Sequence, residues 1–211
     1  MHRRAAAIVV ALALGATPAL GDEWPGPRTV SVFSGDGRRF VRLVPGTSVG
    51  ESVGFAGAPK GAPARGEFYL RQGDRSYRLV ADVALANPVA PVEALVSNAG
   101  HLITFDNWHN AGYGAVVAIY DPSGRFVRSW RLEDLYDAKR IADIPRSVSS
   151  RWWRCAPRGF VDPPTQHQVY AFERLGGSFV FTLASGAVAY TAGRARCAEP
   201  IGGPFSATFH P

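Results

Sequence analysis

Residues 92–106 read VEALVSNAGHLITFD, and residues 115–132 read AVVAIYDPSGRFVRSWRL. In each stretch an apolar run is interrupted by a short segment rich in Asn, Asp, Pro, Ser or Gly and then resumes. This pattern is typical of a strand, a tight turn and a second strand. Two such hairpins in succession predict a four-stranded antiparallel meander over residues 92–132.

Similar groups of strand-like runs lie on both sides of this meander. Residues 30–44 and 67–83 each contain two runs around a turn, and residues 169–191 contain three runs. The groups resemble the bacterial β-propeller repeat families, in which four-stranded meanders are repeated along the chain. The resemblance is best over residues 91–132, weaker over 29–85 and weakest over 168–191. It implies a fold and no particular activity.

The number of groups limits what this fold can be. The chain has about three such units, whereas a closed propeller typically has at least about four blades. We therefore expect an all-β protein of antiparallel four-stranded meanders in a partial or degenerate propeller-like array, with a β-sandwich as the alternative.

One short helix is expected near residues 132–142. Glu133 and Asp134 lie in its first turn and Lys139 and Arg140 lie later, which matches the helix dipole. Pro145 follows and is expected to end the helix.

The first 21 residues have the order of regions that is typical of a secretory signal peptide. Basic residues at 3 and 4 precede the ten-residue apolar run Ala5–Leu14, and small residues follow up to Gly21. Because a membrane-spanning helix needs roughly twenty apolar residues, the run is too short to be an anchor. We expect cleavage before Asp22 and a single exported domain over 22–211, in the periplasm or outside the cell.

The charge of the chain does not indicate a nucleic-acid partner. The net charge is +6, and removal of residues 1–21 leaves 21 basic and 17 acidic residues, or +4. The basic residues are nearly all arginines, and they are scattered along the predicted strands. This is typical of solvated strand faces and not of a phosphate-binding groove.

Cys155 and Cys197 are the two cysteines of the chain. In an exported protein, separated cysteines of even number usually form disulfides, and two cysteines allow one pairing. We therefore predict a Cys155–Cys197 disulfide. A catalytic thiol is the alternative, and it would need a nearby histidine, for which His167 is the candidate by sequence.

Residues 46–54 contain the pattern G-x-S-x-G twice, with Ser48 and Ser52 at its centre. This pattern positions a nucleophilic serine when a strand precedes it and a helix follows it. Here glycines and prolines follow, at Gly57, Pro59, Gly61 and Pro63, and they exclude a helix. We expect a surface loop and no catalytic serine.

The densest group of polar and aromatic residues is the loop Asp106–Gly114. Loops between strands often display functional groups, so Asp106, Asn107, Trp108 and His109 are candidate binding residues. The structural alternative is that the carboxylate and amides hold the turn and that the tryptophan closes the core. Asp106 and His109 provide two potential metal ligands without an identifiable third, so no metal or cofactor is predicted.

Arg151 and Trp152 are the other candidate binding residues, in the segment Arg151-Trp152-Trp153-Arg154. Tryptophan stacks on sugars, and together with arginine it can hold an anion. Ordinary packing beside the predicted disulfide is the alternative. Since adjacent strand residues point to opposite faces, one of the two tryptophans is expected to serve a given surface.

Two functional hypotheses follow from these residues. The first is a non-catalytic extracytoplasmic β-domain that binds a protein or an envelope component. The alternative is a hydrolase or metal-dependent enzyme that uses the Asp106–His109 loop. The alternative requires that Asp106, His109 and a further carboxylate or histidine converge in one pocket.

Overall fold

The computed structural model describes residues 24–47, 61–73, 76–193 and 197. The predicted signal peptide and the two serines of the G-x-S-x-G pattern, Ser48 and Ser52, lie outside these residues.

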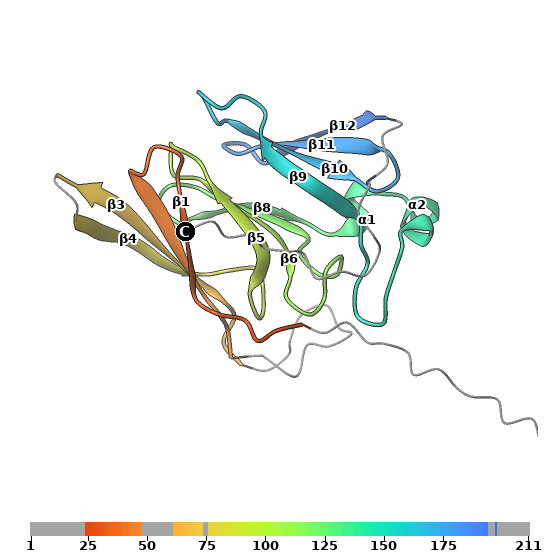
Figure 1. Ribbon diagram of the computed structural model, residues 1–211, viewed down its shortest axis with the longest axis horizontal. Coiled ribbons are helices and arrows are strands. Elements are labelled where there is room, and N and C mark those ends of the chain that lie inside the picture. The colour runs from red at the N-terminus through yellow and green to blue at the C-terminus, as the bar shows by residue number, and fades with distance from the viewer. Residues whose placement is uncertain (1–23, 48–60, 74–75, 194–196, 198–211) are drawn as a thin grey trace, which may run out of the picture.

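The described strands form three four-stranded antiparallel meanders, which confirms the all-β prediction (Figure 1). The first sheet contains β1 (Val30–Phe33), β2 (Arg39–Val44), β3 (Arg65–Gln72) and β4 (Ser76–Ala84). The middle sheet contains β5 (Pro91–Val96), β6 (Leu102–Asn107), β7 (Val117–Tyr120) and β8 (Phe126–Trp130). The third sheet contains β9 (Arg154–Phe160), β10 (Gln168–Glu173), β11 (Gly177–Thr182) and β12 (Ala187–Ala192). In each sheet the strands are neighbours in chain order.

Strand β9 was not expected from the sequence. It contains Pro157 and Gly159, two residues that are uncommon inside strands. The structure places β9 at the edge of the third sheet, where it pairs with β10. A proline that lacks an N–H donor is tolerated at such an edge. With β9 included, the third group of runs becomes a complete meander.

The middle sheet is covered on both faces. Because successive side chains of a strand point to opposite faces, Leu102 and Ala118 pack in one core cluster with Val41 and Phe68 of the first sheet. Ile103, Phe105 and Ile119 point the other way and pack with Phe179 and Phe181 of the third sheet. The two cores explain why every residue of β6 and β7 is buried.

The first strands of the three sheets, β1, β5 and β9, lie next to one another (Figure 1). The turns that follow these three strands are also joined. Asn98, in the turn after β5, forms hydrogen bonds to the turn after β1 and to the turn after β9. Its Oδ1 accepts the N–H of Asp36 at 3.0 Å, and its own N–H donates to Oε1 of Gln166 at 2.6 Å. The first hairpins of the three sheets therefore meet at one end of the molecule.

The predicted helix near 132–142 is divided into two, α1 (Leu132–Leu135) and α2 (Ala138–Asp143), so the prediction of a single helix is wrong. Tyr136 and Asp137 between them have extended backbone. The Asp137 side chain accepts the N–H of Arg140 at 2.8 Å, and it thereby starts a new helix. Among the described residues, no helix has the length and apolar character needed to cross a membrane.

Candidate functional site

The loop Asp106–Gly114 leaves the end of β6 with Asp106 turned inward. Asp106 has a left-handed backbone, with φ of 58°, and its side chain is buried. Its Oδ1 accepts the N–H of Gly112 at 2.9 Å and Nε1–H of Trp153 at 2.8 Å. A side chain at position 112 would meet the carbonyl oxygen of Arg151 at 2.3 Å, and φ there is +79°, so this position requires glycine.

Arg154 is the centre of a buried ion network that joins two sheets. Its Nε donates to Oδ2 of Asp106 at 2.7 Å, and its Nη1 donates to Oε2 of Glu93 at 2.6 Å. Arg158 forms a second ion pair with Glu93. Burial alone lowers the pKa of Arg154, but the two adjacent carboxylates outweigh it and raise that pKa. Asp106 and Glu93 belong to the middle sheet and Arg154 to the third, so the network fixes the sheets to each other.

Asn107 is also directed inward. Its Nδ2 donates to the carbonyl oxygen of Tyr113 at 2.6 Å, and its Oδ1 accepts from Nδ2 of Asn87 at 2.9 Å. Asn87, which sequence reasoning missed, also donates to the carbonyl oxygen of Asp106 at 3.0 Å and accepts from Thr104 Oγ1 at 3.0 Å. Both amides therefore hold the loop in place.

Trp108, His109 and Trp152 surround Trp24, a residue that the sequence had not singled out. Ring centroids lie 5.5 Å from Trp24 for Trp108, 6.0 Å for His109 and 6.2 Å for Trp152, whose ring is stacked on that of Trp24. Trp108 Nε1 donates to the carbonyl oxygen of Pro25 at 2.9 Å. Three of the candidate binding residues are thus brought together, around the N-terminal part of the described chain.

Arg151 lies beside the same loop. Its Nε donates to the hydroxyl of Tyr113 at 3.3 Å, and its guanidinium carbon lies 5.3 Å from the centre of that ring. Of the tandem tryptophans, Trp152 faces Trp24, whereas Trp153 is buried in the core with its ring 6.2 Å from that of Phe179.

A pocket with a volume of about 300 Å³ adjoins this loop, between the first strands of two sheets. We call it the β1–β5 pocket. Its lining consists of Pro25, Gly26, Pro27, Arg28, Val30, Val32, Leu43, Ala90, Pro91, Val92, Glu93, Ala94 and Trp108. Most of these residues are apolar, and Glu93 is the acidic residue among them. Its carboxylate is paired with Arg154 and Arg158.

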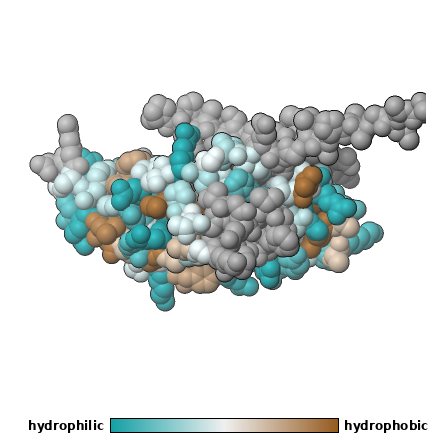
Figure 2. Space-filling model, turned by 90° about the horizontal axis from the view of Figure 1, so that it is seen from below, coloured by the Kyte–Doolittle hydropathy of each residue, from teal (hydrophilic) through white to brown (hydrophobic). Residues whose placement is uncertain are grey.

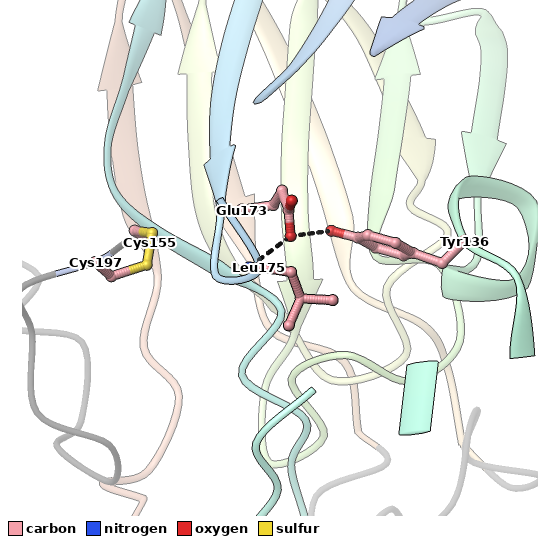
Figure 3. Close-up of a disulfide and its surroundings, with 5 residues drawn as sticks. All are labelled: Tyr136, Cys155, Glu173, Leu175 and Cys197. Atoms are coloured by element: carbon pink, nitrogen blue, oxygen red, sulfur yellow. Dashed lines mark hydrogen bonds between the residues drawn. A yellow bond between two sulfur atoms is a disulfide. The ribbon is translucent and has the colours of Figure 1, made fainter. Parts of the chain in front are cut away.

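The predicted disulfide is confirmed. Cys155 and Cys197 are bonded, with their Cα atoms 5.7 Å apart (Figure 3). The bond ties residue 197, which follows β12, to β9 at the edge of the third sheet. The catalytic-thiol alternative is therefore wrong, because both sulfur atoms are in the bond.

Glu173 is a second buried carboxylate, in the region drawn with the disulfide in Figure 3. It accepts the N–H of Leu175 at 2.7 Å, the hydroxyl of Tyr136 at 3.4 Å and Nη2 of Arg140 at 3.0 Å. Burial, followed by the charge of Glu173, raises the pKa of Tyr136. This group anchors the segment that contains α1 and α2 on the third sheet, and it takes no part in the β1–β5 pocket.

The arrangement of the loop and of the β1–β5 pocket suits the binding of an apolar group better than it suits proton transfer by Asp106 or His109. In the described part of the chain, no three His, Cys, Asp or Glu side chains are grouped in a way that could hold a metal ion. Asp106 is engaged by Gly112, Trp153 and Arg154, and neither Asp106 nor His109 lines the pocket. An apolar pocket with an aromatic wall is instead suited to an apolar group.

Two histidines make stability depend on pH. Burial lowers the pKa of His109 from 6.5, and it also lowers that of His101, where Asp121 opposes the shift. The unfolded state therefore binds more protons just below pH 6.5, so the free energy of unfolding falls as pH decreases through that range. We expect His101→Gln/His109→Asn to flatten this dependence in urea titrations between pH 7 and 5. Equal slopes for the variant and the wild type would contradict the assignment.

The chain matches no protein-family model and no curated protein sequence.

Proposed function

We propose that the chain is a non-catalytic extracytoplasmic β-domain that binds a protein of the cell envelope. The β1–β5 pocket accepts an apolar side chain of that partner. The observation that carries the proposal is the pocket itself, of about 300 Å³ and lined mainly by apolar residues between two sheets. Well-packed apolar pockets of this kind receive the anchoring side chains of protein partners.

The walls of the pocket support this assignment. Trp108 is held by its hydrogen bond to Pro25, and Val92 and Leu43 are buried in strands of two different sheets. Walls that are formed by paired strands need little ordering when a ligand binds. Arg28, an exposed residue of the lining, suits a polar or acidic neighbour of the inserted group.

The pairing of Glu93 argues against catalysis in the pocket. Its two oxygens each contact a different arginine, Arg154 and Arg158. A carboxylate whose two oxygens are both held by arginines is fixed in place by those ion pairs and is poorly positioned to act on a ligand.

Two features support an exported domain. Disulfides persist in oxidising compartments, and Cys155 and Cys197 are bonded. Residues 1–21 have the regions of a secretory signal peptide. Both features agree with a partner in the envelope.

Filling the pocket tests the proposal. Ala94→Phe would occupy the space with the variant's own ring. We expect it to reduce the affinity for the partner by about tenfold or more, since an anchor residue commonly contributes more than about 1 kcal/mol. The measurement is photo-crosslinking in intact cells from a benzophenone amino acid placed at Arg28, followed by quantification of the crosslinked protein.

The matched control is Ala142→Phe, which adds the same ring at an exposed position of α2. It should leave the crosslinking yield unchanged. An unchanged yield in Ala94→Phe, or a crosslink that forms to lipid alone, would refute the proposed protein ligand.

A further inference from the structure

We propose that two copies of the chain associate around a twofold axis to form a closed ring of six four-stranded sheets. In this ring the outer face of the first sheet of each copy packs on the outer face of the third sheet of the other. The proposal is independent of the ligand of the β1–β5 pocket.

Within one copy, the sheets already pack face to face in the way that we propose for the contact between copies. The middle sheet has a sheet on each face, with Phe68 in one core and Phe181 in the other. Within the described residues, the first and third sheets each have one face packed on the middle sheet and one face turned away from it, and Cys197 is bonded to β9 of the third sheet. The strands β1, β5 and β9 lie next to one another, so the three sheets extend outward from a common line (Figure 1). This arrangement of first strands is that of propeller blades.

The outer face of the third sheet has no charged residue on its three fully described strands. Strand alternation identifies this face, because Val169, Ala171, Phe179 and Phe181 point inward. The outward residues of β10, β11 and β12 are Gln168, Tyr170, Phe172, Ser178, Val180, Thr182, Ala187, Ala189 and Thr191. In a chain with 19% charged residues, such a face has the charge depletion of an interface core.

The outer face of the first sheet carries an aromatic cluster that crosses all four strands. Phe40 is stacked on Tyr69 with ring centroids 4.5 Å apart, and it lies 4.9 Å from both Phe33 and Tyr77. Phe33 is 54% exposed, which is unusual for a residue in such a cluster. Aromatic residues are enriched in interface cores.

Five charged residues lie on this face, and four of them form ion pairs within it. Arg42 pairs with Glu67, and Arg65 pairs with Asp82. The fifth charged residue, Arg71, lies near the end of β3, opposite Tyr77. We infer that the two outer faces pack together, since one carries an aromatic cluster with four of its five charges paired and the other is uncharged.

The need to close the ring of sheets indicates a second copy of the chain as the partner. The outer faces of the first and third sheets lie on opposite sides of the middle sheet, so one copy cannot pair them. Closed propellers have roughly four to eight blades, and two copies of three sheets supply six. Twofold dimers are the commonest soluble homo-oligomers, and here the symmetry covers all four uncovered faces. On the side seen in Figure 2, the coloured hydrophobic residues are dispersed among hydrophilic ones.

The test is the mass of the mature chain, 22–211, in analytical ultracentrifugation over a range of concentrations. We expect a species of twice the single-chain mass. Phe172→Arg, which places a charge on the uncharged face, should raise the dissociation constant at least about 30-fold, as loss of a central interface residue does. Val148→Arg is the control, because Val148 is 74% exposed and lies outside both faces.

A mixture of variants tests which faces meet. Phe33→Arg and Phe172→Arg are each expected to be monomeric, whereas their mixture retains one intact pair of faces and should form some dimer. Far-UV circular dichroism checks folding, and Thr182→Arg on the same outer face replaces Phe172→Arg if that variant does not fold. A wild-type monomer at all concentrations, a dimer insensitive to these variants, or assembly into open chains would overturn the proposal.

Discussion

Replacing Arg154 with alanine is expected to lower the free energy of unfolding by about 3–5 kcal/mol. The guanidinium is 1% exposed and neutralises Asp106 and Glu93, which are themselves buried. Without it, two carboxylates remain in the core, and Arg158 contacts only Glu93 of the two. The removal of one partner from a buried ion pair is costly because the remaining charge loses its compensation. Urea unfolding at neutral pH, followed by tryptophan fluorescence, measures the loss.

Arg78→Ala is the matched control, since Arg78 is an exposed arginine on β4. It should change stability by less than about 0.5 kcal/mol. If Arg154→Ala lost no more stability than Arg78→Ala, the buried network would not be holding the middle and third sheets together.

Cys155→Ser and Cys197→Ser should each destabilise the oxidised protein by about 4 kcal/mol. The bond closes a separation of 42 residues, and in the chain-entropy model a loop of this size restricts the unfolded state by about that amount. Cys155 is buried and Cys197 is partly exposed, so serine at 155 should cost slightly more. Urea unfolding without reductant gives both values.

The double variant Cys155→Ser/Cys197→Ser separates the bond from the side chains. It should be about as unstable as each single variant, and a reductant should destabilise the wild type but not the double variant. Free thiols in protein isolated under alkylating conditions, or a wild type indifferent to reductant, would contradict a stabilising bond.

The fold could be predicted from the sequence wherever it depends on strand alternation and turn residues within a short stretch of chain. The alternation and turns over residues 92–132 gave the middle sheet, and the same features gave most strands of the other two. Strand β9 was missed because Pro157 and Gly159 obscure it, and its place is set by pairing with β10. The single helix was wrong because the capping preference of Asp137 outweighed the continuous charge pattern.

The candidate site depended on contacts that are distant in the sequence. Asp106 was correctly considered as a residue that holds the turn, but its partners Trp153 and Arg154 lie 47 and 48 positions away. Tyr113 and Arg151 are near one another only because the loop and the segment before β9 meet. The β1–β5 pocket combines residues from 25–32 with Leu43, residues from 90–94 and Trp108, and no local pattern links them. Trp24 was overlooked for the same reason.

The cysteine pair also sets an order for maturation. In the part of the chain that the structure describes, Cys197 follows the last strand, β12, which ends at Ala192. During synthesis, which starts at the N-terminus, the chain therefore carries Cys155 as a lone thiol until strands β9 to β12 have been synthesised. With two cysteines, no incorrect intramolecular bond can form in the meantime. Formation of the disulfide therefore marks a chain whose synthesis has passed β12 and reached Cys197.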